Sequence, residues 1–183
     1  MGLGHINSVN ETIFDDIWEY DPASDTWTQK ANFGGGLRYH PVAFSIDDKG
    51  YVGTGRSFTS SSHNDFWEFD PVTNTWTQIA DFAGSGRSGA VAFVVDGLAY
   101  VGLGTVQGGV GANAFYAYDP IADTWTPIQD FPGNGRNTGV AFSIEDKGYV
   151  GTGNGTYGTG NDFWEYKPSQ DQWLQKADAV SYT

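Results

Sequence analysis

The chain has 183 residues, with 9 basic and 22 acidic side chains, a formal net charge of −13 and no cysteine. An acidic surface repels nucleic-acid phosphates, and a chain without cysteine forms no disulfide and has no thiol chemistry. No apolar run approaches the roughly 18 residues of a membrane-spanning helix, so we expect neither a nucleic-acid partner nor a membrane span.

A unit of about 49 residues recurs along the chain. Its last tryptophan falls at Trp27, Trp76, Trp125 and Trp173, in steps of 49, 49 and 48 residues. A period near 50 that is built from short strands and glycine turns is typical of a propeller blade. We expect each of these tryptophans to be a core residue of its blade.

The chain begins part of the way through a unit. Residues 1–4 match residues 101–104, which end a second strand. The sequence therefore predicts a half-blade over residues 1–33. Complete blades follow over residues 34–82, 83–131 and 132–179 in one propeller unit.

The strands of a unit are clearest in the third repeat. An apolar run over 89–95 is followed by Asp96-Gly97, the signal for a tight type I′ hairpin, and returns over 98–104. A third strand is expected over 114–118 and a fourth over 125–129, after an Asp-Pro bend. The prediction is an all-β fold of four-stranded antiparallel blades.

These motifs resemble the kelch repeat family. The resemblance rests on the aromatic residue of the third strand and on glycines that end the second strand, here spaced by one residue as in Gly53-Thr54-Gly55. The third-strand aromatics are Trp18, Trp67, Tyr116 and Trp164. The resemblance implies a kelch-like β-propeller, a fold that serves adaptors, oxidases and sugar isomerases alike.

A series of three blades and a half-blade leaves sheet edges open. Three arrangements of the chain would resolve these open edges: a piece of a longer propeller, two copies in one ring, or a lone four-bladed ring. We expect a homo-oligomer or a fragment of a longer propeller, and residues 179–183 could add a strand to the half-blade.

One face of the propeller is expected to carry long loops, over residues 5–14, 56–64, 105–113 and 154–161. Up-and-down strand order places these loops together, opposite tight hairpin turns. All four arginines of the chain fall on this loop-rich face. Long loops on a rigid scaffold are common binding sites.

Three arginines recur just before the first strand of a blade. The kelch resemblance implies that they surround the mouth of a central channel, where such arginines hold acidic groups of a ligand. The alternative is that each arginine braces the blades by bonding loop carbonyls or nearby Asp81 and Asp130. The candidate ligand-binding residues are Arg38, Tyr39, His40, Arg56, Arg87, Ser88, Arg136, Asn137 and Asn154.

No metal or cofactor site is expected. His5, His40 and His63 occupy different repeat positions and lack ligand spacing. The Asn64-Asp65 and Asn161-Asp162 pairs lie in no calcium-loop motif, and we interpret them as caps of strand entries. The loop aromatics Tyr39, Phe58 and Tyr157 could stack on sugar rings.

The sequence thus favours a non-catalytic module that binds a protein or a glycan through its loop-rich face. A structural repeat of a larger surface protein is the first alternative, and the composition is compatible with a cell-surface location. A sugar isomerase-like kelch enzyme is the second alternative, although no acid–base pair is visible in the sequence.

Overall fold

The computed structural model describes residues 2–6, 12–58, 62–155 and 158–180, and these residues form β-strands joined by turns and loops. The first sheet contains β1 (Gly2–Ile6), β2 (Thr12–Asp21) and β3 (Thr26–Lys30). The second contains β4 (Val42–Ile46), β5 (Lys49–Gly53), β6 (Phe66–Asp70) and β7 (Thr75–Ile79).

Two further four-stranded sheets follow. The third sheet contains β9 (Val91–Val95), β10 (Leu98–Gly102), β12 (Phe115–Asp119) and β13 (Thr124–Pro127). The fourth contains β15 (Val140–Ile144), β16 (Lys147–Gly151), β19 (Phe163–Lys167) and β20 (Gln172–Gln175), with a 3-10 turn η1 (Pro168–Gln170) before β20. Neighbouring strands within each sheet are antiparallel. The predicted fold class, a kelch-like propeller with three complete blades and a partial one, is confirmed.

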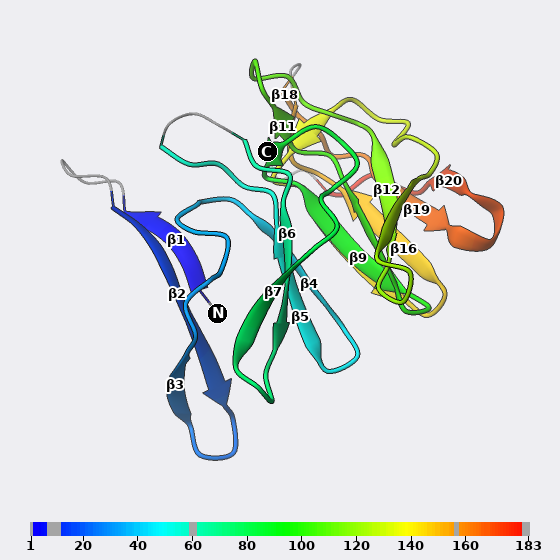
Figure 1. Cartoon of the computed structure of the whole chain (residues 1–183). Coiled ribbons are helices and arrows are strands. Elements are labelled where there is room, and N and C mark those ends of the chain that lie inside the picture. The colour runs from blue at the N-terminus through cyan, green and yellow to red at the C-terminus, as the bar shows by residue number, and fades with distance from the viewer. Residues whose placement is uncertain (1, 7–11, 59–61, 156–157, 181–183) are drawn as a thin grey trace.

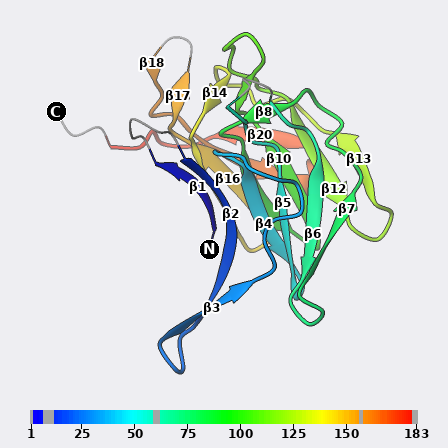
Figure 2. The ribbon, with the colours of Figure 1, turned by 60° about the vertical axis from the view of Figure 1, so that its left-hand side comes forward.

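The sheets follow one another around an arc, with hairpin turns at one end and longer loops at the other (Figures 1 and 2). Short strand pairs rise from the loop end. They are β8 (Arg87–Ser88) with β11 (Thr105–Val106), and β14 (Arg136–Asn137) with β17 (Asn154–Gly155) and β18 (Gly158–Thr159). Segments that we expected to be irregular loops are therefore partly ordered strands.

Local backbone chemistry explains the hairpins and the glycine motif. Asp96 and Gly97 both have positive φ, 51° and 75°, as a type I′ turn requires. In the glycine motif, a Cβ on Gly53 would lie 2.3 Å from the Phe66 ring, so no larger residue fits. Gly55 has a φ of +91°, a value that side-chain-bearing residues rarely adopt.

The core lies between adjacent sheets and is rich in aromatic rings. Phe66 of the second sheet packs against Trp125 of the third at a centroid distance of 4.9 Å. Phe115 repeats this contact with Trp173 of the fourth sheet at 5.1 Å. Burial of these large apolar surfaces is the main force that holds one sheet against the next.

Each sheet is also hydrogen-bonded to the one before it. The Trp125 indole donates to the Ala80 carbonyl at 3.0 Å, and the carboxylate of Asp123, in the hairpin turn, accepts from the Ala80 amide at 2.9 Å. Trp76 with Asn74 and Trp173 with Asp171 make the corresponding bonds. The hairpin turn of one sheet thus contacts the backbone of its predecessor.

The expectation for Trp27 needs correction. Trp173 is 5% exposed and Trp76 and Trp125 are half-buried, but Trp27 is 49% exposed. On the side of the first sheet where Trp27 lies, no described residue packs against the ring in the way that Phe66 of the second sheet packs against Trp125 of the third. On the fourth sheet, Val140, Phe142 and Ile144 are also exposed, at 50%, 42% and 53%.

Candidate binding face

The loop-rich face is built around the three recurring arginines, whose side chains lie inside the blades. Arg38, Arg87 and Arg136 are 1%, 2% and 3% exposed. Each guanidinium lies over a phenylalanine ring of the preceding loop, Phe33, Phe82 or Phe131, at 4.6–5.0 Å from the ring centroid. The structure therefore buries these groups instead of presenting them at an open channel mouth.

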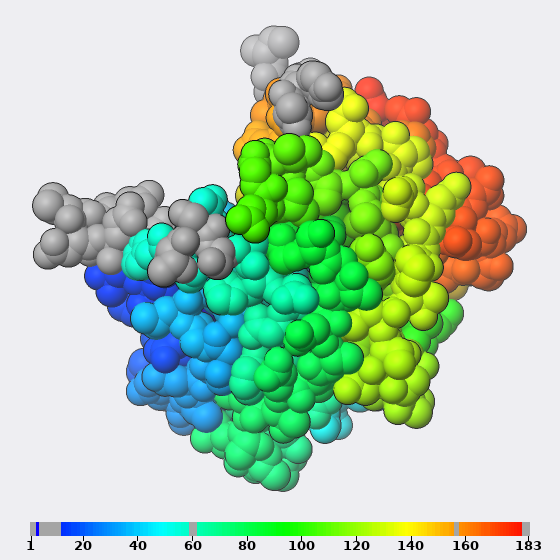
Figure 3. Space-filling model, turned by 45° about the horizontal axis from the view of Figure 1, so that its top comes forward, coloured from blue at the N-terminus to red at the C-terminus, as the bar shows by residue number. Residues whose placement is uncertain are grey.

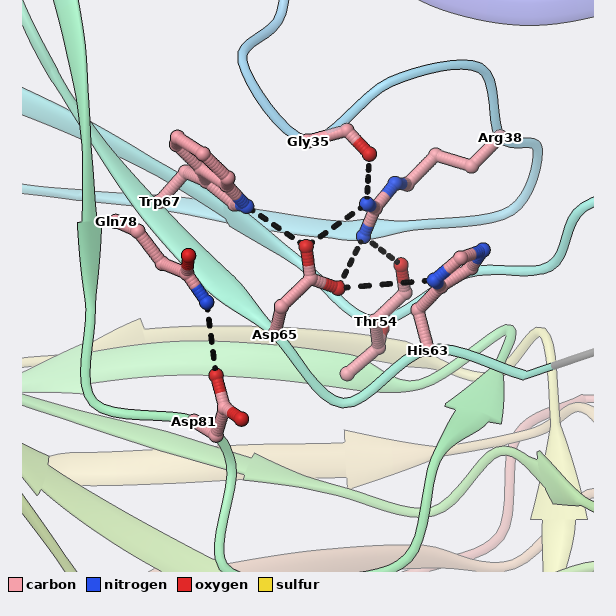
Figure 4. Close-up of polar contacts among 8 residues, drawn as sticks. All are labelled: Gly35, Arg38, Thr54, His63, Asp65, Trp67, Gln78 and Asp81. Atoms are coloured by element: carbon pink, nitrogen blue, oxygen red, sulfur yellow. Dashed lines mark hydrogen bonds and ion pairs between the residues drawn. The ribbon is translucent and has the colours of Figure 1, made fainter.

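Arg38 shows how the buried guanidinium is held (Figure 4). It donates to both carboxylate oxygens of Asp65, at 2.8 and 2.9 Å, and to the Thr54 carbonyl at 2.9 Å. It also bonds the Gly35 carbonyl, which fixes the loop before the blade. The Trp67 indole donates to the same carboxylate at 2.7 Å. The guanidinium thus joins a loop and a strand end, and the carboxylate links it to the third-strand aromatic.

The fourth sheet repeats the arrangement. Arg136 donates to both oxygens of Asp162 and to the Thr152 carbonyl, and the Trp164 indole donates to Asp162 at 2.7 Å. For Arg38 and Arg136 these contacts favour the bracing interpretation over ligand binding, because their forked donors already face a carboxylate.

The partners differ from those that we expected. Asp81 accepts a hydrogen bond from Gln78 at 3.2 Å and does not pair with an arginine among the contacts of the described residues. Asp65 and Asp162 take that role, so these residues are ion-pair partners and not simple strand caps. The recurrence of aspartate two residues before the third-strand tryptophan was the sequence signal for this pairing.

Burial and hydrogen bonding act in opposite directions on these carboxylates. Burial raises the pKa of Asp65, but hydrogen bonds from Arg38 and Trp67 outweigh it and hold the pKa below the usual value. Arg136 and Trp164 have the same net effect on the pKa of Asp162. Both side chains are therefore ionised at neutral pH.

Arg87 differs from the other two arginines. It donates to the carbonyls of Ser85, Leu103 and Ala114, at 3.1, 3.0 and 3.4 Å, and none of these bonds goes to a carboxylate. Burial lowers the pKa of Arg87 to about 10.

The backbone of the arginines links neighbouring blades. The Arg87 carbonyl accepts from the Gly55 amide at 2.8 Å, and the Arg136 carbonyl accepts from the Gly104 amide at 2.7 Å. The third residue of these two glycine motifs thus bonds the arginine of the next blade. This ladder gives the loops of the face a rigid base.

The remaining candidate residues lie on two parts of the face. Ser88, Asn137 and Asn154 belong to the short strands β8, β14 and β17. The Asn137 side chain donates to the Thr105 hydroxyl, so this bond joins the fourth repeat to the third. Tyr39 and Arg56 exchange two backbone hydrogen bonds at 3.0 Å. The Nε atom of Arg56 is buried and has no hydrogen-bond partner among the described residues.

The loop-rich face also carries an aromatic cluster. We define it as Tyr39, His40 and Phe58. The Tyr39 ring is 5.3 Å from His40 and 6.3 Å from Phe58, between centroids, and Phe58 is 46% exposed. His40 has a φ of 53°, unusual for a residue with a side chain. Tyr157, the third predicted loop aromatic, lies outside the described residues.

The described residues contain no cluster of three or more His, Asp or Glu side chains that could hold a metal ion. They also contain no helix long and apolar enough to cross a bilayer.

Comparisons with known proteins agree on the architecture. Residues 38–83 match the family described as the Kelch motif. Among 179 matching chains of solved structures, YjhT superposes with a TM-score of 0.80 at 22% sequence identity, over 92% of this chain and 60% of that one. No curated protein matches the chain. The likeness to YjhT shows the fold alone, and this chain spans 60% of the length of YjhT.

Proposed function

We propose, since the chain carries a kelch motif on a kelch-type β-propeller fold, that it is a non-catalytic module that binds a protein or a glycan through its loop-rich face. The aromatic cluster of Tyr39, His40 and Phe58 is the observation that supports this proposal. Figure 3 shows the loop end of the molecule, where successive repeats lie as sectors in chain order.

The cluster combines the exposed ring of Phe58 and the half-buried ring of Tyr39 with a backbone that is fixed at Tyr39. Two hydrogen bonds hold Tyr39 to Arg56. The residue before Tyr39 is the buried Arg38, which is held in place by its bond to Asp65. Rings that are held in place before a ligand arrives lose little conformational entropy on binding. Such rings suit stacking on the apolar face of a sugar or on a side chain of a partner protein.

The test is binding to immobilised oligosaccharides and peptides, followed by titration of each hit. We expect Phe58→Ala and Tyr39→Ala to weaken binding at least tenfold, because each removes a ring contact. Ile121→Ala is the matched control, since Ile121 is 97% exposed in a hairpin turn at the opposite end. Equal affinity of Phe58→Ala and the control would contradict the proposal.

A second role, assembly with further copies of the chain, is supported by the exposed apolar side chains of the first and fourth sheets. Trp27 and Tyr20 are 49% and 44% exposed on the first sheet, and Phe142 and Ile144 are exposed on the fourth. Burying such surfaces against another copy would remove apolar area from water. Light scattering should then give a mass near twice 19.8 kDa or higher, and a monomer would contradict this role.

A further inference from the structure

The third repeat lacks a pair of charged side chains that the second repeat carries at the hairpin-turn end. In the second sheet, Glu68 accepts from the Tyr51 hydroxyl at 2.9 Å and forms an ion pair with Lys49. In the fourth sheet, Glu165 accepts from the Tyr149 hydroxyl at 3.0 Å. Each glutamate lies opposite its tyrosine on the adjacent strand, so the hydroxyl is engaged within its own sheet.

The third repeat keeps the tyrosine but not these partners. Ala117 lies opposite Tyr100 on the adjacent strand, and Leu98 stands where the second repeat has Lys49. Tyr100 is 4% exposed, and its hydroxyl makes no hydrogen bond among the described residues. Leaving a buried hydroxyl without a partner is unfavourable, so a ligand that bonds this group gains from it.

A cleft gives access to this hydroxyl. It has a volume of about 430 Å³ and lies between the third and fourth sheets, lined by Tyr100 and Ala117 on one side and by Tyr166 on the other. The cleft between the second and third sheets is smaller, about 370 Å³, and is lined by Lys49 and Glu68. A volume of about 430 Å³ is in the range of small-molecule sites.

The charged groups of the cleft are all negative. Its acidic lining residues are Asp119 and Asp171, and none of the described residues that line it is a lysine, arginine or histidine. The Oδ1 atom of Asp119 accepts from two amides of its own turn, and that of Asp171 accepts from the Tyr166 hydroxyl and the Gln129 amide. In neither carboxylate does Oδ2 accept a hydrogen bond from a described residue. Both carboxylates therefore have an oxygen available to a donor.

The negative charge extends to the unpartnered hydroxyl. Burial and the charges of Asp96 and Asp171 raise the pKa of Tyr100, so its hydroxyl is neutral at neutral pH. A neutral hydroxyl accepts as well as donates, and the same negative charges attract a cation to its oxygen.

The rest of the lining suits an apolar stem. Leu98, Ala117 and Ile128 provide aliphatic surface. The Tyr100 and Tyr166 rings lie 5.5 Å apart, between centroids, and aromatic faces attract ammonium groups. The lining therefore matches an organic cation, with an ammonium group at one end of a short aliphatic chain.

We propose that the cleft between the third and fourth sheets binds a primary ammonium group on an aliphatic stem. The ammonium donates to the Tyr100 hydroxyl oxygen, and the carboxylates of Asp119 and Asp171 supply the compensating negative charge. Lys49 supplies such a cation from within the chain in the second sheet. The site lies at the hairpin-turn end, so it does not depend on binding through the loop-rich face.

The probe is n-butylammonium chloride, and the readout is the two-dimensional amide spectrum of the isotope-labelled chain. Two reference compounds separate the site from general attraction by a chain of net charge −13. Ammonium chloride at equal ionic strength has the charge without the stem, and n-butanol has the stem without the charge. Long-range attraction is the same for all cations of one charge, whereas the site requires both parts.

Butylammonium should shift the amides of Leu98, Ala117 and Thr126 in a saturable manner. Both reference compounds should need at least tenfold higher concentrations for the same shifts. An equal response to butylammonium and to ammonium chloride, or equal shifts at the corresponding turns of all repeats, would overturn the proposal.

Two variants test the hydroxyl and the space separately. Tyr100→Phe keeps the ring and removes the hydroxyl, so it should weaken binding at least threefold. Ala117→Met fills the cleft with an apolar side chain and should abolish the saturable shifts. Neither change removes a side-chain hydrogen bond among the described residues, and the thermal midpoint of each variant checks that it folds. Unchanged affinity in Ala117→Met would refute the site.

Asp119→Asn and Asp70→Asn form a matched pair. Each aspartate accepts from two amides of its own turn, which an asparagine oxygen can also do, and each change removes one negative charge. Asp70 occupies the same position in the second sheet and does not line the cleft. Asp119→Asn should weaken binding at least fivefold and Asp70→Asn less than twofold. Equal losses would assign the binding to the acidic surface as a whole and contradict the proposal.

A final comparison identifies the source of the amine. A blocked peptide with a central lysine should bind at least tenfold more tightly than butylammonium if the amine belongs to a partner protein. Tighter binding of diaminobutane than of the peptide would assign the site to a free small amine. Both results support an amine site, and failure of butylammonium, the peptide and diaminobutane to bind would refute it.

Discussion

Replacing Asp65 with alanine should destabilise the protein by about 3 kcal/mol, because the change leaves the buried Arg38 guanidinium without its counter-charge. Two hydrogen bonds from Arg38 and one from Trp67 are lost. Removing one partner of a buried ion pair costs about 3–5 kcal/mol. The Asp65 side chain is 21% exposed, so water can replace part of the carboxylate, which favours the lower end of that range.

Urea denaturation followed by tryptophan fluorescence measures this loss. Asp81→Ala is the matched control, because Asp81 is exposed and accepts a single side-chain hydrogen bond, from Gln78. Its free energy of unfolding should change by no more than about 0.5 kcal/mol. If Asp65→Ala lost less than about 1 kcal/mol, the ion pair would not brace the loops, and the reasoning would fail.

Two other predictions follow from the same structure. The pKa values of Asp65 and Asp162 lie below the usual 3.8 in the folded state, so their stabilising contribution is present above that value and is lost as pH falls through the folded pKa. Unfolding measured from pH of about 5 to about 2 should therefore show a steeper loss for the natural chain than for the double variant Asp65→Asn/Asp162→Asn, and parallel curves would speak against this linkage. Trp173→Ala should cost about 3–5 kcal/mol in chemical denaturation, since the ring is 5% exposed and packs on Phe115. Trp27→Ala, at 49% exposure, should cost less than half as much, and similar losses would show that Trp27 is also buried in solution.

The parts of the fold that local chemistry dictates could be predicted from the sequence. Asp96-Gly97 between two apolar runs specifies a hairpin, because both residues tolerate positive φ and the strands twist to match. The spaced glycines marked strand ends, where Gly53 has no room for a Cβ beside Phe66. Repetition of these signals at one period was enough to predict the blades.

The candidate site was harder to predict, because its contacts join distant residues. Arg38 and Asp65 are 27 residues apart, whereas Asp81 lies close to the next arginine, Arg87, along the chain. Sequence proximity therefore suggested the wrong partner. The exposure of Trp27 could not be predicted from its repeat position either, since it depends on what packs against the first sheet.

The hairpin aspartates and asparagine that bond the preceding sheet have two separable tasks. Asn74, Asp123 and Asp171 adopt positive φ, between 46° and 56°, and their side chains bond the amides of residues 31, 80 and 129. Glycine at position 74 would keep the backbone of the turn and remove the bond to the neighbour, whereas glycine at position 123 or 171 would also remove a hydrogen bond from Tyr118 or Tyr166 of the same sheet. The coupling between the first and second sheets can therefore be weakened at Asn74 alone, as in a linear array with nearest-neighbour coupling. Amide exchange measured sheet by sheet would then show where along the array the chain opens first.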